Sequence, residues 1–167
     1  MDISEFNSKN EEQIREELSR CCGSRNWVNC MLSSRPFNGL DQMLEIADKC
    51  WEQTNEEDWL ESFHHHPKIG DIESLAKKFA STSNMAGDEQ SGVKNADMKI
   101  LQALAEGNRD YEEKFGFIFI VYASGKRAEE MLGILNERMN NDRYSEIRIA
   151  AAEQHKITRL RITKMFA

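Results

Sequence analysis

Residues 117–123, Phe-Ile-Phe-Ile-Val-Tyr-Ala, form the one stretch of this chain that is rich in the branched and aromatic side chains typical of a β-strand. No second stretch of this kind is present to pair with it. Because a lone strand cannot satisfy its backbone N–H and C=O groups in a sheet, these groups need other partners. We therefore expect 117–123 to cross the core as an extended or irregular segment, and a polar ligand could be one of its partners.

The rest of the sequence shows helical periodicity. In residues 40–53, for example, apolar side chains recur every three or four positions and share one face. Ser8 with Glu11, and Thr54 with Glu57, have the spacing of capping boxes, which mark helix starts. The sequence predicts an all-α fold, a compact bundle of about seven or eight helices with one irregular extended segment through the core. We expect the helices at about 10–22, 27–35, 40–53, 54–63, 72–80, 95–114, 126–139 and 143–165.

Length and charge restrict the class of protein. A chain of 167 residues fits one domain, covering 1–167, with a substantial core. Its 22 Lys and Arg against 29 Asp and Glu give a formal net charge of −7, so we expect no nucleic-acid or anionic-lipid partner. An anionic ligand would need a local arginine. The sequence has no apolar run long enough to cross a membrane. Its acidic, polar first residues are not typical of a signal peptide, which favours a cytoplasmic protein.

The four cysteines are Cys21, Cys22, Cys30 and Cys50, and none belongs to a Cys-x-x-Cys pair. We expect them to be reduced thiols in helices, with mostly structural roles, in a cytosolic protein. A zinc site built from cysteines and histidines is an alternative, but the spacing matches no standard zinc motif.

Three of the four histidines are adjacent, at positions 64–66, and Pro67 follows them. Because proline keeps the preceding residue out of the helical region, we expect His66 to be extended at the end of a helix. An imidazole fixed in this way suits proton transfer near neutral pH. The alternative is a solvated loop that happens to be rich in histidine.

The last expected helix carries an arginine on an apolar stripe. Ile147, Gln154, Ile157 and Arg161 follow one another along this stripe. If the two isoleucines face the core, so does Arg161, and a buried guanidinium needs an anionic partner. A structural salt bridge or a side chain that reaches out to solvent is the alternative.

Four motifs follow one another along the chain. They are His66-Pro67-Lys68-Ile69-Gly70, Glu89-Gln90-Ser91-Gly92, Asn108-x-x-Tyr111-x-x-Lys114-Phe115-Gly116-Phe117-x-Phe119-Ile120-Val121 and Glu153-x-x-Lys156-Ile157-x-x-Leu160-Arg161-Ile162. In this order and spacing they resemble the OHCU decarboxylase family of urate degradation, whose substrate is 2-oxo-4-hydroxy-4-carboxy-5-ureidoimidazoline, or OHCU. The resemblance covers nearly the whole chain.

The resemblance implies an all-helical homodimer that converts a small anionic imidazoline to (S)-allantoin and carbon dioxide without a metal or organic cofactor. Carried over by motif, His66 is the catalytic acid/base and Glu89 its carboxylate partner. Gln90 would then hydrogen-bond the substrate, and Arg161 would bind its carboxylate or ureido oxygen. The other pocket-lining residues would be Pro67, Ala86, Gly87, Asp88, Phe119, Ile120, Val121, Tyr122 and Ala123.

Ala86 departs from the family pattern, which often has a serine there, so one substrate hydrogen bond is missing or comes from Ser83, Ser91 or water. The implied chemistry needs no electron-sink cofactor, because the substrate carboxylate lies beside a carbon–nitrogen double bond. We expect His66 to handle the hydroxyl proton of the substrate, and His66 or Glu89 to control stereospecific protonation. Two alternatives stay open: a metal-dependent hydrolase that uses the three histidines, and a non-catalytic helical interaction module with a pH-sensitive histidine patch.

Overall fold

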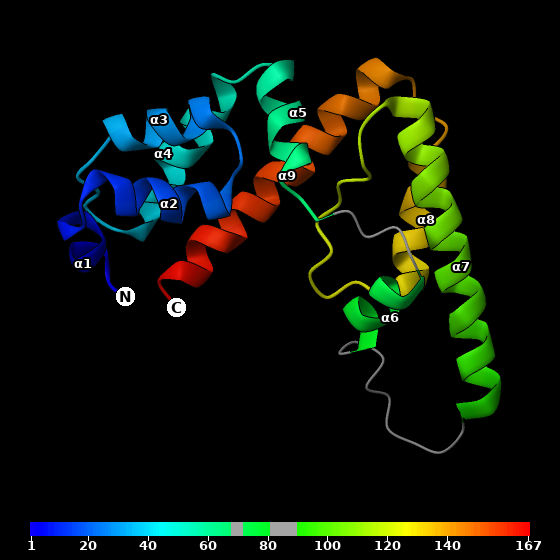
Figure 1. Ribbon diagram of the computed structural model, residues 1–167. Coiled ribbons are helices and arrows are strands. Elements are labelled where there is room, and N and C mark those ends of the chain that lie inside the picture. Colours follow the sequence, from blue (N-terminus) through cyan, green and yellow to red (C-terminus); the bar gives the residue numbers. More distant parts are fainter. Residues whose placement is uncertain (68–71, 81–89) are drawn as a thin grey trace. The chain divides into compact units, whose positions relative to one another are not determined.

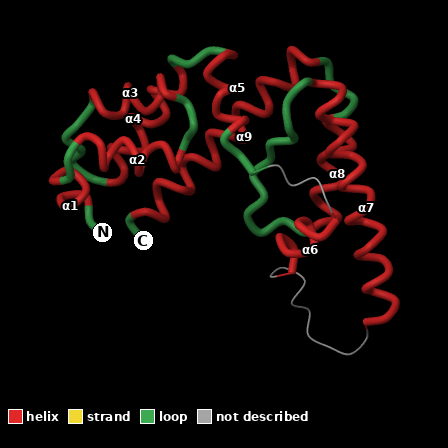
Figure 2. The backbone as a smooth tube through the Cα atoms, viewed as in Figure 1, coloured by secondary structure: helices red, strands yellow, loops and turns green. Residues whose placement is uncertain are grey.

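The computed structural model describes residues 1–67, 72–80 and 90–167, and at 72, 78, 80 and 90–97 it describes the backbone alone. Over these ranges the chain forms nine α-helices and no strand (Figure 1, Figure 2). The all-α class is therefore confirmed. The helices are α1 (Ile3–Ser8), α2 (Glu11–Cys21), α3 (Arg25–Ser33), α4 (Leu40–Glu52), α5 (Glu56–His64), α6 (Ile72–Ala80), α7 (Gln90–Phe115), α8 (Ala128–Arg138) and α9 (Arg143–Met165).

The helix starts differ from the predicted ones near the N-terminus and before α5. Ser8 ends a short helix, α1, that was not expected, and asparagines at positions 10 and 55 cap α2 and α5. The capping boxes predicted at Ser8 and Thr54 are thus wrong by two residues and one residue. Asparagine caps as well as serine or threonine, and the hydroxyl of Thr54 instead accepts a hydrogen bond from the indole Nε1 of Trp59 at 3.0 Å.

Contacts between residues divide the chain into two compact units. The first unit comprises residues 1–66 and 149–167, which hold α1–α5 and most of α9. The second unit comprises residues 67–148, which hold α6–α8 and the beginning of α9. Each unit buries its own apolar side chains, and the prediction of one domain over 1–167 stays a prediction.

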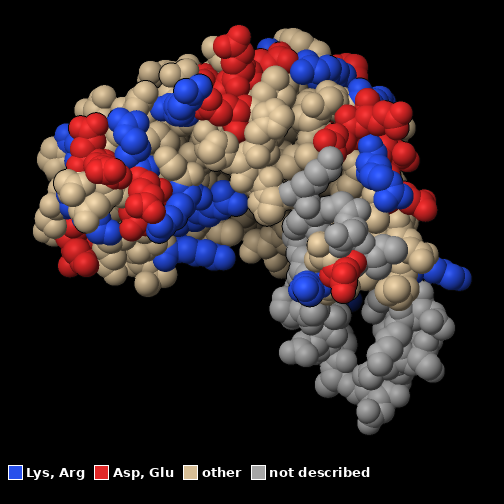
Figure 3. Space-filling view, viewed as in Figure 1, with Lys and Arg blue, Asp and Glu red and all other residues tan. Residues whose placement is uncertain are grey.

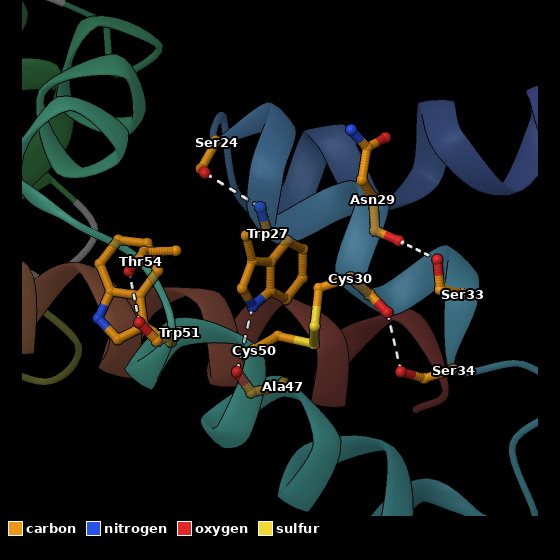
Figure 4. Close-up of a disulfide and its surroundings, with 10 residues drawn as sticks. All are labelled: Ser24, Trp27, Asn29, Cys30, Ser33, Ser34, Ala47, Cys50, Trp51 and Thr54. Atoms are coloured by element: carbon orange, nitrogen blue, oxygen red, sulfur yellow. Dashed lines mark hydrogen bonds between the residues drawn. A yellow bond between two sulfur atoms is a disulfide. The ribbon is translucent and has the colours of Figure 1, made fainter.

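The first unit buries the apolar faces of its helices together. Trp27 on α3 is fully buried, and its Nε1 donates to the backbone oxygen of Ala47 on α4 at 3.1 Å (Figure 4). The buried indole therefore keeps a partner for its only polar atom. Other fully buried side chains of this unit are Phe6, Ile14, Leu18, Met31, Met43, Phe63 and Ile162.

A disulfide joins Cys30 of α3 to Cys50 of α4, next to Trp27 (Figure 4). The expectation of four reduced thiols is therefore wrong for this pair, whereas Cys21 and Cys22 are free and buried. The packing of α3 against α4 sets the Cα–Cα distance of the pair at 5.7 Å, which suits a disulfide. A sequence separation of 20 residues gives no hint of that distance.

The second unit contains the segment predicted to be irregular. Residues 117–123 form neither helix nor strand, and Phe117, Ile120 and Val121 are buried, as expected. Gly116 and Gly125 bracket the segment with φ of 82° and 74°, a left-handed conformation that glycine adopts without strain. The segment therefore enters and leaves through two turns that its sequence encodes.

Acidic and basic side chains are interspersed on the face shown in Figure 3. The whole sequence has a formal net charge of −7. None of the helices in the described ranges combines the length and the hydropathy that a membrane crossing requires.

Candidate active site

His66 follows His65, the residue that caps the end of α5, and its backbone N–H donates to Phe63 O at 3.1 Å. The side chain is half-buried in the first unit, where its Nε2 forms a hydrogen bond with Oε1 of Gln154 on α9. The imidazole is thus held by a protein side chain at a helix end. The alternative of a freely solvated histidine in a loop is therefore wrong for His66.

The three adjacent histidines occupy different environments. His64 ends α5 and is exposed, while the ring of His65 lies against Gly23 so closely that a Cβ there would be 2.4 Å from its Cγ. Any side chain at Gly23 would displace His65, which explains the glycine. Only His66 of the three makes the contact with Gln154. In the described part of the chain no group of three or more His, Cys, Asp or Glu side chains could hold a metal.

Arg161 lies on the same stripe of α9 as Gln154 and Thr158, but it is half-buried where those two are fully buried. The expectation of an inward arginine is therefore corrected to a partly exposed one, near the C-terminal end of the helix. The Nη1 group of Arg161 lies 3.4 Å from the backbone oxygens of Arg20 and Cys21 at the end of α2. No carboxylate of the described residues pairs with Arg161, so these residues do not support the alternative of a structural salt bridge.

His66 contacts the face of α9 that also carries Arg161, because it forms a hydrogen bond with Gln154 on that face. Gln154, Thr158 and Arg161 are spaced by four and three residues, which places them along the same side of the helix. At 1.5 Å per residue, Gln154 and Arg161 are about 10 Å apart along the axis. The first unit therefore presents the imidazole and the guanidinium on one side of a single helix.

The burial of Cys21 and Cys22 makes these two thiols unreactive. Burial raises the pKa of Cys21 to about 12, against a smaller opposing effect of the Arg161 charge. Burial likewise raises the pKa of Cys22, whose Sγ lies 3.4 Å from the hydroxyl of Ser62. Both cysteines therefore stay protonated at neutral pH and act as packing residues.

Several predicted site residues lie outside the described residues, namely Ala86, Gly87, Asp88 and Glu89. Gln90 begins α7, but its side chain is likewise undescribed. Pro67 and the run from Phe119 to Ala123 belong to the second unit. Their predicted roles stay predictions.

Within the second unit, donors from α8 and the turn before it reach two carbonyls of the 117–123 segment. Arg138 Nη1 donates to Ile120 O at 2.7 Å, and Lys126 Nζ donates to Tyr122 O at 2.8 Å. The guanidinium of Arg138 also lies 4.7 Å from the centroid of the Phe119 ring. The expectation that backbone groups of this segment find partners outside a sheet is confirmed for these carbonyls, and one of the partners is a buried arginine.

Arg138 was missed by the sequence reasoning, although a signal was present. Met131, Leu135 and Arg138 follow one another by four and three residues, which places the arginine on the buried face of α8. Its carboxylate partner is Glu146, at 2.6 Å, and the hydroxyl of Tyr111 also donates to that carboxylate. Burial, followed by the hydrogen bond to Glu146, raises the pKa of Tyr111 above its usual value. The phenol therefore stays protonated as a donor.

Comparison with known proteins bears on the family of the chain. Residues 7–163 match the family described as OHCU decarboxylase. The chain belongs to the OHCU decarboxylase family. Among curated relatives, it is 38% identical over 152 residues to the uric acid degradation bifunctional protein TTL of Arabidopsis thaliana, covering 91% of this chain and 47% of that protein. It thus spans about half the length of that bifunctional relative.

Two further members of the family extend the likeness. A 2-oxo-4-hydroxy-4-carboxy-5-ureidoimidazoline decarboxylase of Haloferax volcanii is 26% identical over 135 residues, which covers 81% of this chain and 77% of that protein. The crystal structure of an OHCU decarboxylase in the presence of (S)-allantoin superposes with a TM-score of 0.73 at 38% identity. It covers 95% of this chain and 99% of the other. An OHCU decarboxylase fold thus accounts for nearly all of this sequence.

Proposed function

We propose that this protein decarboxylates OHCU to (S)-allantoin in urate degradation. The observation that carries the proposal is an arrangement in the first unit. The His66 imidazole binds Gln154 of α9, and the guanidinium of Arg161 projects from the same side of that helix. An acid/base and an anion-binding group in one unit are what the decarboxylation of a small carboxylate requires. Membership of the OHCU decarboxylase family supports the same reaction.

The proposed chemistry starts with loss of the carboxylate. The carbon–carbon bond to the carboxylate breaks, carbon dioxide leaves, and the electron pair moves into a bond to the neighbouring carbon. The nitrogen that was doubly bonded to that carbon then takes a proton. The enol that results loses its hydroxyl proton and gains a proton on carbon, from one face, to give the (S) product.

His66 handles the hydroxyl proton in this proposal, and His66 or Glu89 controls the protonation on carbon. General acid–base help of this kind is worth about 10²–10⁴-fold in rate. Arg161 orients the anion. If it bound the carboxylate equally well in the ground state and in the transition state, this binding would lower KM without raising kcat. The two backbone oxygens at 3.4 Å leave this guanidinium with capacity for an anion.

The other parts of the site are proposed on the family pattern. Gln90 would donate to the substrate, and the pocket would also be lined by Pro67, by residues 86–88 and by residues 119–123. We further propose a homodimer, a cytoplasmic location and a single domain over 1–167. Analytical ultracentrifugation would test the dimer, since a species of twice the 19.3 kDa chain mass is expected.

The direct test adds the purified protein to freshly generated OHCU and follows (S)-allantoin by circular dichroism against the spontaneous decay in buffer. We expect faster loss of OHCU and an excess of the (S) product. His66→Ala should return both the rate and the chirality to the spontaneous values, while far-UV circular dichroism confirms that the variant folds. Full, stereoselective turnover by His66→Ala would remove the proton-transfer role of His66.

A further inference from the structure

The hydrogen bond between His66 and Gln154 belongs to a short buried chain in the first unit. Gln154 and Thr158 are 1% and 0% exposed. The amide Nε2 of Gln154 lies 3.2 Å from the Thr158 hydroxyl, and that hydroxyl lies 3.1 Å from the backbone oxygen of Gln154. A buried amide stays in place only when its oxygen and its NH₂ both have partners.

The direction of each hydrogen bond in this chain follows from the number of protons available. The Thr158 hydroxyl has one proton, which it donates to the backbone oxygen of Gln154, so its oxygen accepts from the neighbouring amide. The NH₂ of Gln154 must therefore face Thr158, and its carbonyl oxygen must face His66. An amide oxygen accepts hydrogen bonds but cannot donate them. The Nε2 atom of His66 must be the donor.

We propose that Gln154 is a positioning residue that fixes neutral His66 as the Nε2–H tautomer, so that Nδ1 is the nitrogen that exchanges protons with the substrate. This inference rests on the proposed role of His66 as the acid/base. Its new content is the identity of the reacting nitrogen and of the residues that select it. In the same way, the partner of one ring nitrogen of a histidine generally decides which nitrogen is available for chemistry.

A neutral amide suits this purpose better than a carboxylate would. A carboxylate beside the ring would stabilise the imidazolium and raise the pKa of the histidine, whereas an amide orients the ring and adds no net charge. Two ionisable side chains of the described residues, Cys22 and Arg161, lie beside this chain and add no negative charge. Burial raises the pKa of the Cys22 thiol, which contacts the Thr158 side chain, and Arg161 on the same side of α9 is a cation.

The test with the sharpest outcome is nuclear magnetic resonance of protein labelled with ¹⁵N-histidine, at a pH above the titration of His66. The ring nitrogen shifts should show a proton on Nε2 in the unmodified protein. Thr158→Val removes the acceptor for the amide NH₂ with little change of shape, so the amide can turn and present NH₂ to the ring. We then expect a shift of the His66 population toward the Nδ1–H tautomer.

The matched control is Thr163→Val, because Thr163 also donates its hydroxyl four residues back, to Arg159 O at 2.9 Å, but is exposed. It should leave the tautomer unchanged. A proton on Nδ1 in the unmodified protein would overturn the proposal. So would an unchanged tautomer in both Thr158→Val and Gln154→Leu.

Kinetics provide the second arm. Gln154→Leu should lower kcat by about 10- to 100-fold with little change in KM, as expected for a residue that orients a catalytic histidine. Gln154→Glu should move the histidine limb of the pH–rate profile to higher pH. If the unmodified protein does not accelerate OHCU decay, the proposed function fails while the resonance data still decide the tautomer. If it does, a normal kcat in Gln154→Leu overturns the positioning role alone.

Discussion

Arg138 and Glu146 form an ion pair at 2.6 Å, with side chains only 7% and 0% exposed. The pair lies within the second unit, and each of its members forms a further hydrogen bond. Arg138 donates to Ile120 O, and Asn141 Nδ2 donates to the second carboxylate oxygen of Glu146 at 3.0 Å. One buried charge pair thus anchors the segment 117–123, of which the family pattern assigns residues 119–123 to the substrate pocket.

Removal of one partner of this pair should destabilise the protein strongly. Arg138→Met leaves the Glu146 carboxylate buried without its cation, a change that typically costs about 3–5 kcal/mol. The free energy of unfolding, measured by urea denaturation, should fall by about that amount. Arg20→Met is the matched control, because Arg20 also pairs at 2.6 Å, with Glu16, but both side chains are about two-thirds exposed. It should change stability by less than about 1 kcal/mol, and equal losses in the two variants would contradict the argument.

The disulfide between Cys30 and Cys50 should stabilise the first unit. It closes a loop of 20 residues, for which the chain-entropy model gives about 3 kcal/mol. Thermal unfolding with and without a reductant should therefore show a lower Tm in the reduced protein. The double variant Cys30→Ala/Cys50→Ala should start at the lower Tm and show no response to reductant. Denatured but unreduced protein should titrate two thiols, those of Cys21 and Cys22, and a count of four would contradict the bridge.

Asp48 should contribute a stability term that depends on acid pH. Partial burial alone would raise its pKa, but hydrogen bonds from His155 and Arg159 outweigh burial and hold the pKa below the ordinary value of 3.8. A carboxyl group with a lowered folded-state pKa stabilises the protein fully above its unfolded pKa, and this stability is lost as the pH falls through the folded value. Asp48→Asn should therefore cost about 1 kcal/mol or less at pH 7, because the Asp48 and Arg159 side chains are each 40% exposed.

The difference between Asp48→Asn and the unmodified protein should then shrink as the pH is lowered from about 5 toward 3. Urea denaturation at several pH values measures it. Asp110→Asn, at an exposed position of α7, controls for the general effect of removing one negative charge. A difference that grows on acidification would show that Asp48 does not have the lowered pKa.

The sequence allowed His66 and Arg161 to be singled out because each has a local signal, a histidine before proline and an arginine on an apolar stripe. The fold class could be inferred in the same way, since an unpaired strand-like run among periodic helices excludes a sheet. These features depend on residues a few positions apart. They are therefore visible without coordinates.

What the sequence could not give depends on contacts between distant residues. His66 and Gln154 are 88 residues apart, and the sequence showed only that Gln154 falls on a buried stripe. The pairing of Cys30 with Cys50 depends on how α3 packs against α4. Arg138 could have been found, because it continues the apolar face of α8. Its ion-pair partner Glu146 could not, since that contact joins two helices across a turn.

Removal of metal ions should leave turnover unchanged. The carbon–nitrogen double bond of OHCU accepts the electron pair released with carbon dioxide, so the proposed chemistry requires no Lewis acid. Activity should persist after dialysis against EDTA, with the metal content measured by plasma emission. Loss of activity that a divalent metal restores would instead favour the metal-dependent hydrolase.

Arg161 should act mainly on substrate binding. Arg161→Gln removes a charge-assisted hydrogen bond to the anion, typically worth about 1.5–3 kcal/mol, so KM should rise by about 10- to 100-fold. Because uniform binding affects KM more than kcat, kcat should fall much less. Arg161→Lys should recover only part of the affinity, since an ammonium group cannot bind a carboxylate in the two-pronged manner of a guanidinium.

The matched control for Arg161 is Arg159→Gln. Arg159 is two residues away on α9 and so lies on a different side of the helix, where its Nη1 pairs with Asp48 at 2.5 Å. This variant should lose a little stability but keep the KM for OHCU. Equal increases of KM in the two variants would mean that a general loss of positive charge weakens binding. An unchanged KM in Arg161→Gln would mean that the anion is held elsewhere, and the side of α9 that carries Gln154 and Thr158 would then serve His66 alone.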